Sequence, residues 1–140
     1  MGDGSGHRRR RGARRTAIEL LYQADVMERT PDAVMEQWAT AGRSIPVYSR
    51  ELVEGVSAHR AEIDRLLGEH AEGWTVPRMA IVDRTILRVA CEELRSGLPA
   101  PIVVNEAVEL ANELSTEDSG RFVNGVLGRI ARDAEGVTSG

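Results

Sequence analysis

Apolar residues recur along this chain at intervals of three and four, and this spacing limits its possible folds more than any other feature. Residues so spaced line one face of an α-helix. No segment shows the sustained apolar and polar alternation of a half-buried strand, and the β-branched run 102–104 is too short to form one. Aromatic residues make up only 4% of the chain. The sequence therefore predicts an all-α fold, a compact bundle of about six to seven helices.

Capping and turn residues set the limits of the expected helices. The first should run from about Ala13 to Arg29, and the second should begin at Thr30-Pro31, a polar N-cap followed by a proline at the first helical position. Glycine and proline predict breaks at 42–46, 73–77 and 97–101. The other expected helices are two segments around 52–56 and 63–67, a central and most apolar helix at 79–94, and two amphipathic helices at about 105–114 and 118–134.

The length of 140 residues fits one domain. Both ends are rich in glycine and small polar residues, which bury too little apolar surface to become ordered. We therefore expect a flexible, disordered arginine-rich N-terminal arm at 1–11, a single all-helical domain at 12–135, and a disordered C-terminus at 136–140.

The single cysteine, Cys91, lies within an apolar helical pattern and has no partner for an intramolecular disulfide. An inert, reduced thiol in the protein core is the better interpretation, and it favours a cytoplasmic protein. The apolar stretch after the N-terminal arginines is interrupted by Glu19, Gln23 and Asp25, so it does not resemble a signal peptide. No segment is long and apolar enough to suggest a membrane span.

Several classes of enzyme are disfavoured by residues that the sequence lacks. All 18 basic residues are arginine, which excludes Schiff-base lysines and the phosphate-binding lysine of P-loop enzymes. The three histidines have no metal-ligand spacing. Glu92 and Glu93 are adjacent, so on a helix they diverge by about 100° and cannot flank a substrate; we expect them to be solvated or ion-paired. The sequence predicts a protein that is not an enzyme and has no cofactor or metal.

Positive charge is concentrated at the N-terminal end. Residues 1–15 carry a net charge of +5, whereas the rest of the chain carries −9. Clustered guanidinium groups can neutralise phosphates and stack on unpaired bases. The alternative is a solubilising tail, but the last two arginines continue into an amphipathic helix, which favours nucleic-acid binding. The candidate RNA-binding arginines are Arg8, Arg9, Arg10, Arg11, Arg14 and Arg15.

Two aromatic residues lie beside basic residues in this pattern. Tyr22 falls within about 40° of Arg11 and Arg15 on the first helix, so its ring can extend the basic row, although it can equally be a residue at the edge of the core. Phe122 lies about 100° from the apolar face of the last helix. It is followed by Asn124 and two glycines, which either form an RNA-accessible patch or allow a neighbouring helix to approach closely.

Five motifs occur together in this chain: Arg-Arg-x-Ala-Arg at 10–14, Leu-Tyr at 21–22, Asp-Arg-Thr-Ile-Leu-Arg at 83–88, Asn-Glu-Ala-Val-Glu-Leu-Ala at 105–111, and Arg-Phe-Val-Asn-Gly-Val-Leu at 121–127. In order and spacing they resemble the NusB family over roughly residues 8–130. The last two motifs at this separation are the most specific. The chain departs from the usual pattern of that family at Asn112 and near Gly128 and Arg129, which could alter RNA affinity.

The resemblance implies a transcription antitermination factor that binds the single-stranded boxA element of nascent ribosomal RNA. The expected partners are NusE, a small-subunit ribosomal protein, and the RNA polymerase antitermination complex with other Nus factors. The implied RNA surface includes the arginine-rich start, Tyr22 and the 118–122 turn; with Asn124 from the pattern above, its candidates in the last helix are Asp118, Arg121, Phe122 and Asn124. The implied NusE contact lies on the central helix, at Asp83, Arg84 and Arg88.

Other functions remain open at this point. The acidic remainder of the chain could dock a basic ribosomal protein, which would make the protein an adaptor with only nonspecific RNA affinity. Similar helical domains also occur attached to ribosomal RNA methyltransferases, but no βαβ cofactor-binding unit follows in this sequence. A homodimer that masks the basic surface is also possible.

Overall fold

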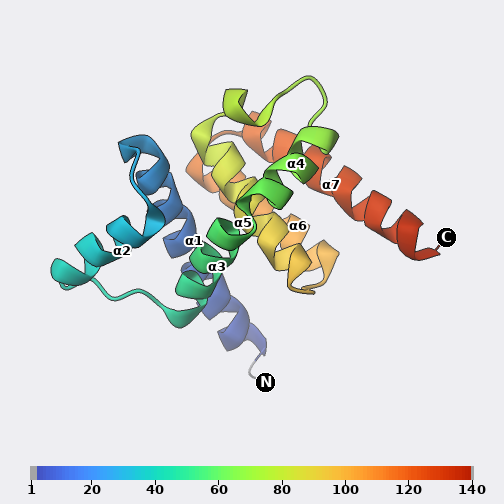
Figure 1. Ribbon diagram of the computed structural model, residues 1–140. Coiled ribbons are helices and arrows are strands. Elements are labelled where there is room, and N and C mark those ends of the chain that lie inside the picture. Colours follow the sequence, from blue (N-terminus) through green and yellow to red (C-terminus); the bar gives the residue numbers. More distant parts are fainter. Residues whose placement is uncertain (1–2, 140) are drawn as a thin grey trace.

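The computed structural model describes the backbone of residues 3–139 and the side chains of residues 10–134. Within that part it contains seven α-helices, one short 3-10 helix and no strand, which confirms the all-α prediction (Figure 1). The elements are α1 (Asp3–Met27), α2 (Pro31–Thr40), α3 (Val47–Ala58), α4 (Arg60–His70), η1 (Val76–Arg78), α5 (Ile81–Arg95), α6 (Ala100–Leu114) and α7 (Glu117–Ser139).

Helix α5 is the centre of the protein, as its apolar sequence predicts. It contacts α1, α3, α4, α6 and α7, and every residue from Thr85 to Glu93 is buried. The buried apolar residues of the molecule form one continuous cluster around it. Cys91 is 3% exposed within this cluster, and burial raises the pKa of its thiol to about 12, as expected for an inert core residue.

A predicted cap explains the start of α2. Thr30 caps α2, since its hydroxyl accepts a hydrogen bond from the Ala33 amide at 3.1 Å, and Pro31 occupies the first turn. The prediction for α6 was wrong, because this helix begins at Ala100 and not near 105. Pro101 was taken as part of a break, yet a proline in the first turn removes only an amide that has no partner within the helix.

The ends of the chain also differ from expectation. Helix α1 begins at Asp3, ten residues before the predicted start, and α7 continues to Ser139. Residues 1, 2 and 140 lie outside the described part, as do the side chains of 1–9 and 135–139. The proposed flexibility of 1–11 and 136–140 therefore stays a prediction, as does the division into an arm and a single domain.

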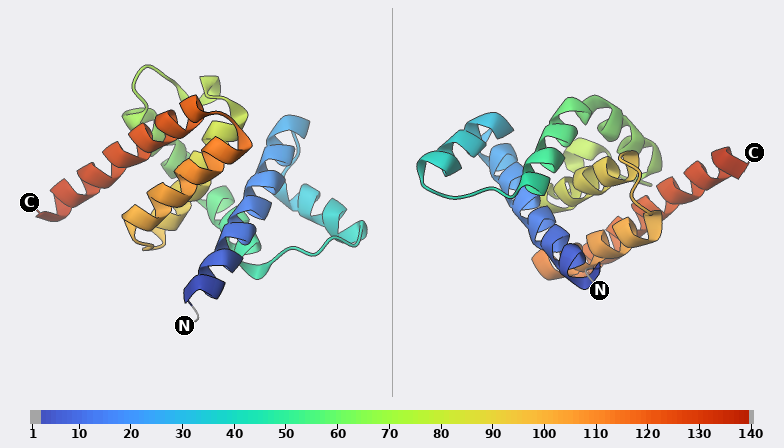
Figure 2. Two further views of the ribbon diagram at one scale, coloured as in Figure 1. Left: turned by 180° about the vertical axis from the view of Figure 1, so that it is seen from behind. Right: turned by 90° about the horizontal axis from the view of Figure 1, so that it is seen from below.

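Helices α1 and α6 run side by side on one face of the molecule, whereas α2 lies at one edge and the C-terminal part of α7 extends from the opposite edge (Figure 2). Polar contacts hold α2 against α1. The Trp38 indole donates a hydrogen bond to Gln23 at 3.0 Å, and Arg43 lies over the Trp38 ring while it donates two hydrogen bonds of 2.9 Å to Glu19. Among the described residues, no helix is both long and apolar enough to cross a membrane.

Candidate nucleic-acid interface

The N-terminal arginines do not share one environment, and Arg14 is the clearest exception. Its side chain is 2% exposed, and Nε lies 2.8 Å from both carboxylate oxygens of Glu93, which is equally buried. Its Nη1 lies 3.6 Å from Glu106 on α6. The expectation that Arg14 belongs to an accessible RNA surface is therefore corrected, because the core already surrounds and neutralises this guanidinium group.

A half-buried tyrosine completes the environment of Glu93. The Tyr48 hydroxyl on α3 donates a hydrogen bond to its carboxylate. Burial, followed by this hydrogen bond and the negative charge of Glu93, raises the pKa of Tyr48. Arg14, Glu93 and Tyr48 thus tie α1, α5 and α3 together. Glu93 is ion-paired as predicted, and it is buried as well.

Arg11 and Arg15 face a row of glutamates on α6. Arg11 donates to both oxygens of the buried Glu106, at 2.9 and 2.7 Å, and to Glu109 at 2.8 Å. The hydrogen bond and charge of Glu106 raise the pKa of Arg11. Arg15 pairs with Glu113 one turn further along. Both arginine side chains remain about half exposed, so solvent and ligands can reach them.

The other candidates on α1 lie around this row. Arg10 is exposed and lies over the Tyr48 ring, 5.5 Å from its centroid. Tyr22 is 40% exposed and shares the helical flank of Arg11 and Arg15, because α1 is continuous through all three. The side chains of Arg8 and Arg9 lie outside the described residues.

A second candidate surface surrounds Phe122. A hollow of about 480 Å³ lies between the start of α7, the start of α5 and the connection from α4 to α5. The rings of Trp74 and Phe122 meet edge to face across it, with centroids 6.3 Å apart and an interplanar angle of 71°. This Phe122 pocket is lined by Trp74, Arg78, Met79, Ala80, Asp83, Asp118, Ser119 and Phe122.

The start of α7 is held in place by its own cap. The Thr116 hydroxyl accepts a hydrogen bond from the Ser119 amide at 3.0 Å. Asp118 lies in the first turn, where the helix dipole favours an acidic residue, and it pairs with Arg121. Asp118, Arg121 and Asn124 are exposed, while Phe122 is half buried. The structure thus brings Asp118 and Phe122 into one pocket, whereas Tyr22 lies on α1, outside the pocket lining.

Sequence reasoning missed several residues of this pocket, among them Trp74 and Arg78. Trp74 is 51% exposed, which is unusual for so large an apolar side chain, and Arg78 is also exposed. Both come from the connection between α4 and α5, where the sequence predicted only a break at 73–77 before the central helix. A tryptophan beside the glycine of a loop was the available signal, but its proximity to Phe122 depends on how α4, α5 and α7 pack.

The three residues predicted to bind a protein partner have different surroundings. Asp83 borders the Phe122 pocket and is 8% exposed, and its Oδ1 has no hydrogen bond in the structure. Burial raises the pKa of Asp83, and a hydrogen bond with Ser119 partly opposes that shift.

Arg84 and Arg88 take part in internal ion pairs. Arg84 donates to Asp25 on α1 at 3.0 and 3.1 Å. Arg88 donates to both oxygens of Asp64 on α4, at 2.9 and 3.0 Å. Their side chains are only 16% and 8% exposed. These arginines therefore hold α5 to α1 and α4, although both also border a hollow of about 610 Å³ next to Trp74.

Gly125 and Gly128 of α7 do not serve a close approach of another helix. A Cβ built at Gly125 would first meet Arg129 of the same helix, at 3.4 Å, and one at Gly128 would meet Arg132 at 3.6 Å. Arg129 extends along this face and donates to the His70 carbonyl at 2.8 Å. At the other departure from the family pattern, Asn112 fills the space over Gly120, where a Cβ would lie 2.0 Å from its Oδ1.

The described part of the chain holds no group of three or more histidine, cysteine or acidic side chains placed to bind a metal ion. The two candidate surfaces present groups that suit the binding of a ligand. One presents guanidinium groups in a row, which suits phosphates. The other presents two aromatic rings beside acidic and basic side chains, which suits stacking and hydrogen bonding of a base.

Comparison with known proteins agrees with the sequence motifs. The model of the NusB family matches residues 11–132. Transcription antitermination protein NusB of Saccharopolyspora erythraea is 49% identical over 129 residues, covering 87% of this chain and 86% of that protein. Its counterpart in Acidothermus cellulolyticus is 45% identical over 130 residues, covering 91% of this chain and 90% of that protein.

Solved structures give the same result. A crystal structure of antitermination factors NusB and NusE in complex with double-stranded RNA contains a chain that superposes with a TM-score of 0.77 at 30% identity, covering 90% of this chain and 98% of that one. T. maritima NusB superposes equally well, with a TM-score of 0.77 at 30% identity, covering 88% of this chain and 90% of that one. Because the family match spans most of the sequence and the fold agrees, this chain belongs to the NusB family.

Proposed function

We propose that this protein is a transcription antitermination factor that binds the single-stranded boxA element of nascent ribosomal RNA together with NusE. It would act within the RNA polymerase antitermination complex, with other Nus factors, in the cytoplasm. Family membership supports the general role, since relatives bear the name transcription antitermination protein NusB. One structural relative was crystallised with NusE and RNA.

The observation that carries the proposal is the Phe122 pocket. Its two aromatic rings are accessible, and base stacking on such rings contributes about 1–3 kcal/mol per base. Asp118 and Asn124 are exposed close to Phe122 in sequence and offer hydrogen-bonding groups to base edges. Arg78 and Arg121 add positive charge for the backbone. This pocket would read bases, while Arg10, Arg11 and Arg15 would hold phosphates.

NusE would contact the surface around Asp83, where α5 begins. Asp83 and the exposed Asp118 place negative charge in the lining of the Phe122 pocket, which suits a basic ribosomal protein. The same observation favours a second candidate function, in which the protein is an adaptor for NusE and binds RNA only nonspecifically. The two candidates differ in whether the protein itself prefers boxA.

Fluorescence anisotropy with a boxA RNA and a scrambled RNA, with and without NusE and at two salt concentrations, tests the proposal. We expect boxA to bind more tightly than the scrambled RNA, and NusE to increase the difference. Affinity should fall with salt, with a slope of about −0.7 per phosphate neutralised. Equal and salt-sensitive binding of both RNAs, with NusE bound normally, would leave the adaptor as the function. Sedimentation of the free protein would show whether a homodimer forms.

A further inference from the structure

Two carboxylates of α6 already hold two of the arginines that the proposed function assigns to RNA. Arg11 Nη2 donates to Glu109 at 2.8 Å, and Arg15 pairs with Glu113. In the free protein, both guanidinium groups therefore already bind oxyanions. A phosphate that reaches these arginines must displace a carboxylate or share the guanidinium group with it.

The buried pairs of this region cannot be displaced in that way. Glu106 is 2% exposed and accepts two hydrogen bonds from Arg11, and Glu93 is held equally firmly by Arg14. Removal of the cation from a buried carboxylate is strongly unfavourable, because no water replaces it. When RNA binds, Arg14 should therefore keep its ion pair with Glu93, and Arg11 should keep its two hydrogen bonds to Glu106.

The outer pairs are different, because solvent reaches both partners. Arg15 and Glu113 are 50% and 49% exposed, and Arg11 and Glu109 are 48% and 52% exposed. Exposed ion pairs contribute little to stability, whereas a phosphate can form strong paired hydrogen bonds with a guanidinium group. RNA can therefore replace these two carboxylates at low cost.

The spacing of the outer carboxylates also matches a nucleic-acid strand. Glu109 and Glu113 are four residues apart on α6, and so are Arg11 and Arg15 on α1, a rise of about 6 Å along each helix. This is on the scale of the separation between neighbouring backbone phosphates. The α1 row thus presents two guanidinium groups to two successive oxyanions.

We propose that Glu109 and Glu113 occupy, in the free protein, the positions of two backbone phosphates of the bound RNA. Their competition with RNA weakens the sequence-independent part of binding, so that specificity depends more on the Phe122 pocket. The inference rests on the proposed function, since it requires RNA phosphates to contact α1. According to this inference, the two glutamates limit the affinity of the protein for RNA, in addition to any contribution that they make to the stability of the fold.

The test replaces Glu113 with glutamine, which keeps the size of the side chain and removes its charge. We expect Glu113→Gln to tighten binding of both boxA and scrambled RNA by about two- to fivefold, the range expected when one exposed ion pair no longer competes. Glu109→Gln combined with Glu113→Gln should increase the effect further. Anisotropy gives the affinities, and circular dichroism confirms that the variants are folded.

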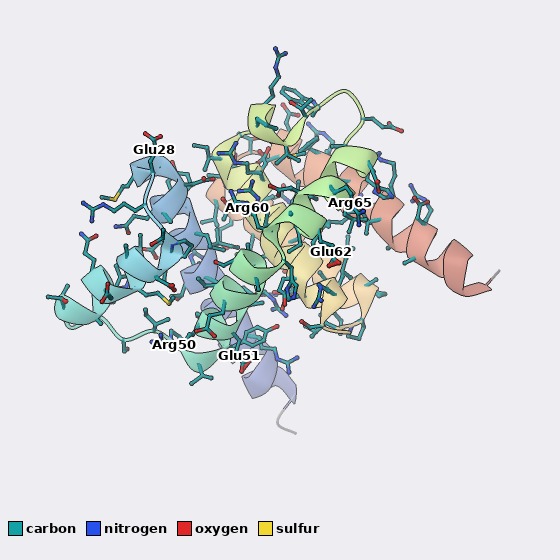
Figure 3. The ribbon with its side chains drawn as sticks, viewed as in Figure 1. Glu28, Arg50, Glu51, Arg60, Glu62 and Arg65 are labelled. Atoms are coloured by element: carbon teal, nitrogen blue, oxygen red, sulfur yellow. The ribbon has the colours of Figure 1, made fainter. Side chains whose placement is uncertain are left out.

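Glu62 on α4, labelled in Figure 3, provides a matched control. It pairs with Arg95 at 3.0 Å, and the two side chains are 55% and 44% exposed. Glu62→Gln removes the same charge, but from α4, and also releases an exposed arginine at the end of α5. We expect it to tighten RNA binding clearly less than Glu113→Gln does. An equal effect of the two substitutions would show that only net charge matters, and would overturn the inference.

Arg15→Ala completes a double-mutant cycle. If Glu113 acts by occupying Arg15, then Glu113→Gln in the Arg15→Ala background should change affinity no more than Glu62→Gln does. A full Glu113→Gln effect without Arg15 would contradict the inference. The wild-type comparison of boxA with scrambled RNA tests the proposed function separately. Equal binding of the two RNAs would contradict boxA recognition but would not affect the inference about the carboxylates. A preference for boxA without any effect of Glu113→Gln would contradict only that inference.

Discussion

Arg14 and Glu93 form an ion pair inside the protein, with Arg14 Nε 2.8 Å from each carboxylate oxygen and both side chains 2% exposed. The next arginine along the helix, Arg15, pairs with Glu113 at the surface, where both side chains are about half exposed. Neighbouring residues of the same type thus belong to two different parts of the molecule. This difference leads to the first prediction.

Arg14→Ala should destabilise the fold, whereas Arg15→Ala should weaken RNA binding. Loss of Arg14 leaves the buried Glu93 carboxylate without its cation, so the free energy of unfolding should fall by about 3–5 kcal/mol. Arg15→Ala, the matched control, should change it by about 0–1 kcal/mol. Urea denaturation followed by circular dichroism measures both. If Arg14→Ala is as stable as the wild type and loses as much RNA affinity as Arg15→Ala does, then Arg14 belongs to the RNA-binding surface and this prediction is wrong.

Phe122→Leu should weaken RNA binding with little effect on its salt dependence. Leucine retains most of the apolar packing of this half-buried side chain but offers no ring for a base, so we expect a loss of about 1–3 kcal/mol in binding free energy. The salt slope should persist because no phosphate contact is lost. Anisotropy with boxA RNA provides the measurement. Val47→Ala, at a side chain 74% exposed on α3, is the control, and the prediction is wrong if the two variants bind equally well.

The thiol of Cys91 should be unreactive until the protein unfolds. Its side chain is 3% exposed, and burial raises its pKa to about 12, so almost no thiolate exists near neutral pH. Mass spectrometry after treatment with iodoacetamide at pH 8 should show little modification of the folded protein and full modification in urea. Rapid alkylation of the native protein would contradict the burial of α5.

The contact between α4 and α7 should weaken as the pH rises. His70 Nε2 lies 2.6 Å from Asp133, and Nδ1 lies 2.9 Å from the Leu66 carbonyl. Burial by itself lowers the pKa of His70, but the hydrogen bonds to Leu66 and Asp133 and the nearby negative charges outweigh it, so the net shift is upward. A pKa raised on folding stabilises the fold fully below the unfolded value, about 6.5, and this contribution is lost as the pH rises through the folded value.

Urea denaturation at pH 5.5 and pH 8.5 checks this dependence. Asp133→Asn should reduce the difference in unfolding free energy between the two pH values, because it removes the negative charge beside His70. Asp32→Asn, at an exposed site on α2, should leave the difference unchanged. The same pH dependence in the Asp133→Asn variant as in the wild type would show that the ion pair with His70 is not its source.

The local pattern of the sequence was sufficient to predict most of the helices, although not the starts of α1 and α6. The spacing of apolar residues predicted a central helix near 79–94, and α5 is buried on all sides at that position. Thr30 and Pro31 marked the start of α2, because a polar cap followed by proline acts within one turn of the chain. The family motifs at 105–111 and 121–127 indicated membership in the NusB family, which the comparisons confirm. These features depend on neighbours in the chain.

Only the tertiary structure shows which candidate residues are buried in the core and which are accessible to RNA. Arg14 and Arg15 have the same chemistry in the sequence, but they point about 100° apart on α1, and only the packing of α5 and α6 decides which one meets a buried carboxylate. Trp74 joins Phe122 only because the α4–α5 connection folds against the start of α7. The sequence by itself indicated the family and most of the helices, since periodicity and capping are local. The tertiary structure decided which arginines are accessible to a ligand, because burial and charge pairing depend on residues about 80 to 100 positions away.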